Sequence, residues 1–250
     1  MNSGCYFITP GAEPHFNMAF DNWLFENISN GQNKIPAYMR LYSWSSPAIT
    51  YGYNQSLSRI LNRNLLPENT PVIKRITGGR AIYHDISEIT FSLIANLEIF
   101  PENRRGLAQV NGMISESIVE ILNKVGINSN WAKSSASDFM TGEGARTKAC
   151  FSSHSRYEVF AEGRKIAAGA QRRAGMYFIH QGSLKVNGIA PCPAIGQQGM
   201  DEDYSTSTGG RNRKYDIADF KTAFGDVFSR KLGLVLTESD LPEEWLYDEE

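Results

Sequence analysis

Two segments of the chain carry residue types that could bind and transfer an acyl group. Residues 74–85 hold a Gly-Gly pair between cations, and residues 149–171 hold a thiol, Cys150, and an amine, Lys165. A thiolate is a nucleophile that can take up an acyl group, and backbone N–H groups of a glycine turn can hold its carbonyl oxygen. Together the two segments predict an acyltransferase.

The centre of the first segment is the turn at residues 77–80, with the sequence TGGR. No Gly-Lys-Ser/Thr follows it and the glycine spacing of a dinucleotide-binding turn is absent, so neither kind of nucleotide loop is indicated. A Gly-Gly pair is most often a plain turn between strands, because glycine tolerates a positive φ. Chemistry is the minority interpretation of such a pair, but the cations Lys74, Arg75 and Arg80 around the turn, and His84 on the strand leaving it, raise it here. We expect a ligand carbonyl or carboxylate to meet backbone N–H groups at this turn.

Cys150 is the candidate nucleophile. A lone cysteine is more often a small buried side chain, and a thiol with the ordinary pKa of about 8.5 is only slightly ionised at neutral pH. A catalytic cysteine therefore needs a cation or base beside it. Lys165 is the first candidate, because the hairpin expected around it would line the same cleft. His154 is the rival base, although a solvent-facing loop histidine is favoured for it. Cys5 and Cys192 have no comparable setting.

Composition sets the bounds for these assignments. The chain has 250 residues, of which 41% are hydrophobic and 21% charged, enough for a substantial core in one large domain, residues 1–250. Its formal net charge of -2 gives no overall attraction to nucleic acid or to an anionic membrane. No signal-peptide pattern and no run of roughly 20 apolar residues is present, so a cytoplasmic location is expected. The three widely spaced cysteines indicate free thiols.

The elements that must position these residues follow from the hydrophobic periodicity. Apolar side chains at helical spacing predict helices at residues 14–30, 105–125 and 217–232. Short β-branched and aromatic stretches predict a meander of strands at 38–42, 48–53, 72–76, 81–84 and 89–95. A hairpin is predicted at 156–161 and 164–170, followed by a strand at 177–186. The helix at 105–125 is expected to cover one face of the sheet.

Two stretches lack such periodicity. Residues 133–148 are rich in Ser, Gly and Ala, and residues 196–214 are polar, so both are predicted to be loops. The first leads directly to Cys150. It is therefore expected to be an active-site lid or a docking loop for an acceptor, with a plain surface loop as an equal alternative.

Four short stretches carry a family resemblance. They are residues 75–85 (RITGGRAIYHD), 88–92 (EITFS), 163–171 (GRKIAAGAQ) and 180–184 (HQGSL). In their order and combination they resemble the lipoate–protein ligase and octanoyltransferase family, from about the first helix to Asn187. Within that family, residues 149–151 (ACF) with Tyr157 and Glu158 most resemble the cysteine-dependent, LipM-like octanoyltransferases.

The resemblance implies a fold and a reaction. The fold is α+β, a mixed β-sheet flanked by helices, similar to the catalytic domain of biotin ligases and class II aminoacyl-tRNA synthetases. The reaction is the transfer of an octanoyl or lipoyl group from an acyl carrier protein thioester to a lysine of a lipoyl-domain protein, with no cofactor and no metal. The acceptor would be the glycine cleavage H protein or a 2-oxoacid dehydrogenase subunit, and neither nucleic acid nor a membrane takes part.

The resemblance also implies roles for particular residues. Cys150 would form the acyl-enzyme, and Lys165 would hold an essential place in the acyl site. From the residues alone, a structural role is favoured for His180, with a pocket-facing position as the alternative. The residues expected to bind the substrate are Arg75, Thr77, Gly78, Gly79, Arg80, Ala81, His84, Gly169, Ala170 and His180.

Three alternatives stay open at this point. An ATP-dependent lipoate ligase would use Lys165 to bind the carboxylate or the α-phosphate and would not need Cys150. An octanoyl amidotransferase acting between two lipoyl-domain proteins would use the cysteine equally well. A non-catalytic lipoate-binding protein would keep the pocket without a reactive thiol. Arg80, which stands where many ligases have a third glycine, favours a transferase over a ligase.

Overall fold

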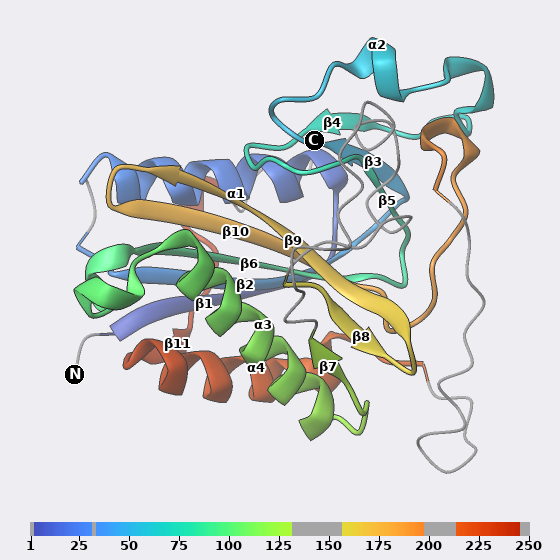
Figure 1. Ribbon diagram of the computed structural model, residues 1–250. Helices are drawn as coiled ribbons and strands as arrows, with labels where there is room; N and C mark the ends of the chain where they lie inside the picture. The colour runs from blue at the N-terminus through green and yellow to red at the C-terminus, as the bar shows by residue number, and fades with distance from the viewer. Residues whose placement is uncertain (1–2, 32–33, 132–156, 198–213, 246–250) are drawn as a thin grey trace.

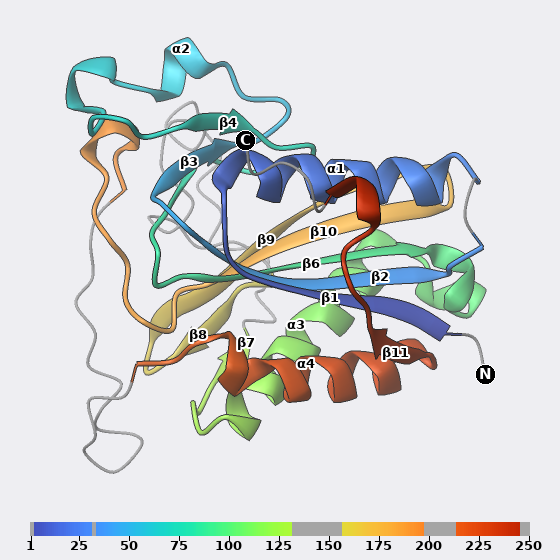
Figure 2. The same cartoon turned by 180° about the vertical axis from the view of Figure 1, so that it is seen from behind.

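The main body of the molecule is a mixed β-sheet with helices on both faces (Figures 1 and 2). The computed structural model describes residues 3–31, 34–131, 157–197 and 214–245. In this part of the chain the sheet has eight strands in the order β11-β1-β2-β6-β10-β9-β8-β7. Their bounds are β1 Ser3–Ala12, β2 Ala37–Trp44, β6 Ile89–Asn96, β7 Asn130–Trp131, β8 Val159–Ala161, β9 Arg164–Ala174, β10 Tyr177–Leu184 and β11 Val235–Glu238.

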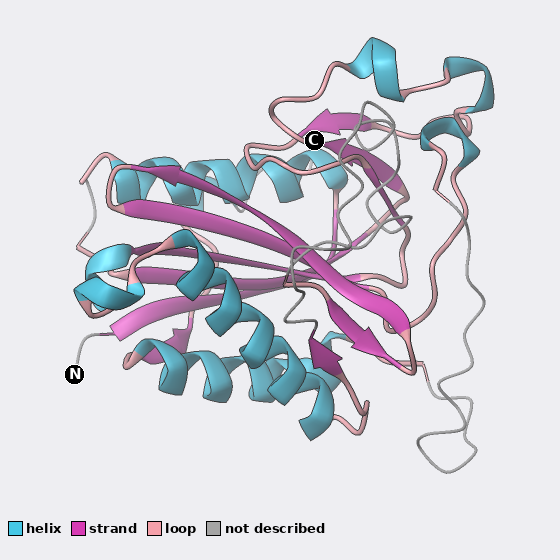
Figure 3. Cartoon of the chain, viewed as in Figure 1, coloured by secondary structure: helices cyan, strands magenta, loops and turns pink. Residues whose placement is uncertain are grey.

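A smaller sheet lies beside the main one, near the N-terminal end of helix α1. Its order is β4-β3-β5, with β3 Ala48–Tyr51, β4 Val72–Lys74 and β5 Ile82–His84. The described helices are α1 Pro14–Ser29, α2 Leu57–Ile60, α3 Leu107–Lys124 and α4 Ile217–Leu232. Short 3₁₀ turns lie at Arg63–Leu65, Leu97–Ile99, Glu102–Arg104, Pro193–Ile195 and Glu243–Trp245. Figure 3 shows how these elements alternate with loops.

The two faces of the main sheet are covered by different helices. Helix α1 packs Phe20, Leu24 and Ile28 on one face, and helices α3 and α4 cover the other (Figure 1). The second face carries the larger apolar cluster, which includes Phe91 and Phe224. Burial of these side chains drives the packing, since each contributes about 1.5–3 kcal/mol when fully removed from water.

The helix ends agree with local sequence. Helix α1 starts with Pro14, and the Glu13 carboxylate accepts a hydrogen bond from the Phe16 N–H. Helix α4 starts with a capping box between Asp216 and Asp219 and is followed by Gly233 in the left-handed region. No helix in the described ranges is long and apolar enough to cross a membrane.

The predicted α+β class, the three long helices and the hairpin are confirmed. The predicted meander is wrong. Strands β1 and β2 run parallel, and the predicted strands at 48–53, 72–76 and 81–84 form the separate small sheet. Parallel pairing needs a crossover, which α1 supplies between β1 and β2. Strand β1 was not predicted, because Gly4, Pro10 and Gly11 interrupt its pattern. The loop predicted at 133–148, and nearly all of that predicted at 196–214, lies outside the described residues.

Candidate functional site

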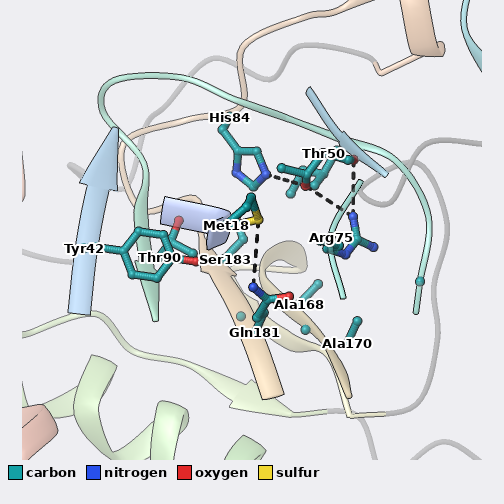
Figure 4. A pocket seen from close by; sticks show the side chains of 14 residues that line it. Met18, Tyr42, Thr50, Arg75, His84, Thr90, Ala168, Ala170, Gln181 and Ser183 are labelled. Atoms are coloured by element: carbon teal, nitrogen blue, oxygen red, sulfur yellow. Dashed lines mark hydrogen bonds between the residues drawn. The ribbon is translucent and has the colours of Figure 1, made fainter. Parts of the chain in front are cut away.

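A pocket lies between the small sheet, helix α1 and the strands β9 and β10 (Figure 4). Its volume is about 50 Å³. It is lined by Met18, Tyr42, Thr50, Arg75, Gly79, Ile82, His84, Thr90, Ala168, Gly169, Ala170, Gln181, Gly182 and Ser183. The structure thus brings together five of the predicted substrate-binding residues, namely Arg75, Gly79, His84, Gly169 and Ala170. Thr77, Gly78 and Arg80 belong to the turn that carries Gly79, and Ala81 follows it.

The guanidinium of Arg75 holds the turn at residues 77–80. It donates hydrogen bonds to the carbonyl oxygen of Gly78 (2.7 Å) and that of Arg80 (2.8 Å), and to the hydroxyl of Thr77 (3.2 Å). A trans peptide places its C=O and N–H on opposite sides. The N–H groups of Gly79 and Ala81, which share peptide units with these two carbonyls, therefore point away from the guanidinium. Arg75 therefore fixes the direction of the backbone donors in the turn.

Gly79 is required by the geometry of the pocket wall. Its φ is 86°, in the left-handed region, and a Cβ there would come within 2.7 Å of the Arg75 guanidinium and 3.1 Å of the Ala170 Cβ. No side chain fits between the turn and β9. The turn can consequently lie directly against the strand that forms the opposite wall.

A fully buried carboxylate, Asp21 on α1, ties the turn to the main sheet. It accepts hydrogen bonds from Ser92 Oγ (2.8 Å), Gln181 Nε2 (2.8 Å), Arg40 Nη1 (3.1 Å) and Tyr42 OH (3.1 Å). The oxygen of the Gln181 amide, Oε1, accepts a hydrogen bond from the Thr77 hydroxyl (2.7 Å). A carboxylate has about four acceptor positions, so Asp21 is saturated and the Gln181 amide has one orientation.

His84 faces the pocket with both ring nitrogens engaged by the protein. Its Nδ1 lies 2.8 Å from Glu88 Oε1 and its Nε2 lies 2.8 Å from Thr50 Oγ1, while the ring stacks on Trp44. The carboxylate fixes the proton on Nδ1, so Nε2 accepts the Thr50 hydroxyl. Burial lowers the pKa of His84, and Glu88 opposes that change. The ring lines the pocket, but its nitrogens are already paired.

Glu88 forms a second buried polar centre behind His84. It is ion-paired with Lys185, itself fully buried, and accepts hydrogen bonds from Thr90 and Ser183. Burial by itself would raise the pKa of Glu88, but His84 and Lys185 outweigh burial and lower it to about 2. The carboxylate is therefore ionised and holds two pocket-lining hydroxyls in place.

The predicted catalytic Lys165 is buried and forms an ion pair. Its Nζ lies 2.6 Å from Oε1 of Glu158, and both side chains are almost inaccessible to solvent. A buried ion pair with this geometry fixes the ammonium group at one point. Lys165 is not among the residues that line the pocket, but it lies on β9, the strand that carries Ala168 and Ala170.

A β-bulge decides which way Lys165 points. The register pairs Phe160 with Lys165 and Val159 with Ala167, which leaves Ile166 as an extra residue on β9. With strict alternation Lys165 would lie on the side of Ala167, in the apolar core under α3. The bulge turns it instead to the side of Glu158, which is also the side that Ala168 presents to the pocket. Sequence periodicity cannot show this reversal.

His180 lies on the other face of the sheet. Its ring stacks on Phe91, 5.8 Å between centroids, and fills the space that a Cβ on Gly169 would need. Its Nδ1 has no hydrogen-bond partner among the described residues, and burial lowers its pKa to about 4. The structure does not bring His180 to the pocket, although it was predicted as a substrate-binding residue. Cys150 and His154 lie outside the described residues.

Several buried polar residues of the site were not assigned a role from the sequence, namely Asp21, Tyr42, Glu88, Gln181 and Lys185. Except for Tyr42, their signal is a charged or amide side chain in or next to a buried element, as Asp21 is after Phe20 on α1. Such a residue is buried only if it has partners. The partners come from other segments, so the sequence marks the residue but not its role.

The architecture is that of lipoate ligases. The structure of lipoate-protein ligase A bound with ATP superposes with a TM-score of 0.69 at 17% identity, covering 97% of this chain and 91% of that one. A bi-partite lipoate protein ligase from Thermoplasma acidophilum gives 0.68 at 16% identity, covering 98% and 89%. At these identities the likeness shows the fold alone.

Sequence comparison assigns the family. Residues 13–190 match the lipoyl protein ligase A/B catalytic domain, and the chain belongs to this family. The octanoyltransferase LipM of Bacillus cereus is 28% identical over 98% of this chain and 91% of its own length. That of Bacillus subtilis is 32% identical over 71% of this chain, which spans 64% of its length. The prediction of an acyltransferase of this family is thereby confirmed.

Proposed function

We propose that this protein transfers an octanoyl or lipoyl group from an acyl carrier protein thioester to a lysine of a lipoyl-domain protein, through an acyl-enzyme on Cys150. The observation that carries the proposal is the Lys165–Glu158 pair on the side of β9 that also lines the pocket. The relatives are named octanoyltransferases, and we infer the identity of the acyl group from those names.

The first step is thioester exchange. The Cys150 thiolate attacks the carbonyl carbon of the donor thioester, the bond from that carbon to the carrier sulfur breaks, and the carrier leaves as a thiolate that takes up a proton. A cation near the thiol favours the thiolate, and we assign that role to Lys165. Glu158 holds the ammonium group in position for it.

The second step is aminolysis. The neutral amine of the acceptor lysine attacks the Cys150 thioester, the amide bond forms, and the Cys150 thiolate is released while the amine loses a proton to solvent or a nearby base. No nucleotide is needed, because exchange between thioesters is nearly balanced and amide formation from a thioester is favourable. Backbone N–H groups of the turn at residues 77–80 would hold the carbonyl oxygen as it gains negative charge.

The partners follow from this chemistry. The donor is an octanoyl-acyl carrier protein, and the acceptor is the glycine cleavage H protein or a lipoyl domain of a 2-oxoacid dehydrogenase. A related fold is described together with an E2 lipoyl domain, which supports an acceptor of that kind. We propose the cytoplasm as the compartment.

One other function has a specific observation in its favour. A structure with the same fold is bound with ATP, so an ATP-dependent lipoate ligase is the second candidate. In a ligase, Lys165 would contact the carboxylate or α-phosphate of the acid being activated. Cys150 would then have no role.

The source of energy separates the two candidates. A lipoyl-domain acceptor is incubated with octanoyl-carrier and no nucleotide, or with free octanoate, ATP and Mg²⁺, and its mass is measured. We expect octanoylated acceptor only in the first mixture, because a free carboxylate does not condense with an amine in water without activation. Modification that requires ATP and free acid would establish the ligase instead.

A further inference from the structure

The pocket is too small for the chain it is proposed to hold. Its volume is about 50 Å³. In the same measure one water molecule takes about 10–15 Å³, so the eight carbons of an octanoyl chain, each about the size of a water molecule, need about 80–120 Å³. Some part of the wall must therefore move before the chain can enter.

Most of the wall has little freedom to move. Among the described residues, every polar side chain that lines the pocket is hydrogen-bonded to another part of the protein. Tyr42 and Gln181 are bonded to Asp21, and His84, Thr90 and Ser183 are bonded to Glu88. Moving one of them leaves a buried polar group without its partner, which costs about 1–3 kcal/mol. The glycines and alanines of the wall have no side chain that can rotate away.

Of the lining residues that the structure describes, two larger apolar side chains remain, Met18 and Ile82. Ile82 is β-branched and lies on strand β5, where its first torsion is restricted. Met18 is unbranched, has three rotatable side-chain bonds and extends from α1 into the pocket (Figure 4). Within the described part of the chain its sulfur has one polar contact, a weak one 3.9 Å from Gln181 Nε2. It is the side chain that can leave its place at the lowest cost.

We propose that Met18 is the movable wall of the acyl pocket and sets the length of the chain that the protein accepts. The inference rests on the proposed acyl-transfer function and adds to it a residue that determines specificity. Rotation of the Met18 side chain opens the space under α1, and the volume that its thioether occupies limits how far the chain reaches.

The proposal predicts shifts in chain-length preference in opposite directions. Met18→Ala removes three heavy atoms beyond Cβ, which makes room for two further methylene groups of the ligand. A buried methylene is worth about a fourfold change in affinity, so the preference for a ten-carbon over an eight-carbon chain should rise about fifteenfold. Met18→Phe fills the space with a stiff ring, so six-carbon chains should gain over eight-carbon chains.

The test is a competition among acyl donors. Equimolar hexanoyl-, octanoyl-, decanoyl- and dodecanoyl-pantetheine are mixed with each variant, and intact mass spectrometry measures which acyl-enzyme forms. Met113→Ala is the matched control, because Met113 is a half-buried methionine on α3, on the opposite face of the sheet. It should keep the chain-length preference of the parent protein.

The outcomes are distinct. Opposite shifts in Met18→Ala and Met18→Phe support the proposal, since general destabilisation cannot move the preference both ways. An unchanged preference in both Met18 variants, or an equal shift in Met113→Ala, overturns it. If the parent protein forms no acyl-enzyme from any donor, the proposed function fails while the role of Met18 is still testable. Calorimetric titration with free hexanoate, octanoate and decanoate must then show the same opposite shifts in affinity, and their absence refutes the role of Met18.

Discussion

The two faces of strand β10 are held by different forces. On the α1 face, Gln181 and Ser183 are hydrogen-bonded to the buried carboxylates of Asp21 and Glu88. On the other face, Phe178 and Leu184 lie in the apolar core under α3 and α4. An apolar core can repack around a changed side chain, whereas a saturated hydrogen-bond network fixes the orientation of each member. The pocket lies on the fixed face, where the substrate contacts need a defined geometry.

Lys165 should give the largest functional effect, because it is a buried cation on the pocket side of β9. Lys165→Ala leaves the Glu158 carboxylate buried without this ammonium group and should slow acyl-enzyme formation by about 10²–10⁴-fold. It should also move the pH dependence of iodoacetamide alkylation at Cys150 to higher pH. An unchanged alkylation profile would show that Lys165 acts on the substrate and not on the thiol. Rates come from intact mass spectrometry under single-turnover conditions.

Asp21→Ala and Phe224→Ala compare the two faces directly. The first leaves the buried Arg40 without its carboxylate and the second leaves a cavity, and each should lower the free energy of unfolding by about 3–5 kcal/mol. Only Asp21→Ala should also weaken binding of octanoate, because the Gln181 amide and the turn it holds lose their anchor. Urea unfolding and calorimetric titration measure the two effects. Equal losses of octanoate affinity in both variants would remove the distinction between the faces.

His180 makes the apolar face sensitive to acid. Its pKa is about 4 in the folded protein and about 6.5 when unfolded, so the unfolded state binds its proton first. Above pH 6.5 the free energy of unfolding therefore does not depend on this group. It falls by roughly 3 kcal/mol as the pH drops from 6.5 to 4. His180→Phe should flatten the stability curve in this window without changing acyl transfer. A slope that survives the substitution would assign the acid sensitivity to another group.

Glu120 and Arg230 should give the smallest effect. Their ion pair, 2.6 Å from Nη2 to Oε1, joins α3 to α4 at the surface, and the Arg230 side chain is 58% exposed. Exposed pairs contribute about 0–1 kcal/mol, so Arg230→Ala should change the urea midpoint little and acyl transfer not at all. If Arg230→Ala lowered the free energy of unfolding by more than about 2 kcal/mol, the face covered by α3 and α4 would depend on charge as the pocket face does.

The sequence predicted the elements better than their arrangement. Helices α1, α3 and α4 and the β8–β9 hairpin were predicted because their apolar spacing is regular. The pairing of β1 with β2 and β11 was not, because contacts between segments far apart in the chain leave no local pattern. Residues of the turn at 77–80 and of the strand at 164–170 were predicted to bind one substrate, and the structure brings Gly79, Gly169 and Ala170 to one pocket. The bulge at Ile166 and the bonds from Asp21 and Glu88 could not be predicted, since each depends on tertiary packing.

The central claim is that a donor thioester supplies the acyl group and that Cys150 receives it. Its most direct test is the intact mass of the protein after mixing with octanoyl-carrier in the absence of nucleotide. The account predicts that one octanoyl group is added to the parent protein, is removed by hydroxylamine and is absent in Cys150→Ser. An unmodified parent protein, or an equal adduct on Cys150→Ser, would contradict it.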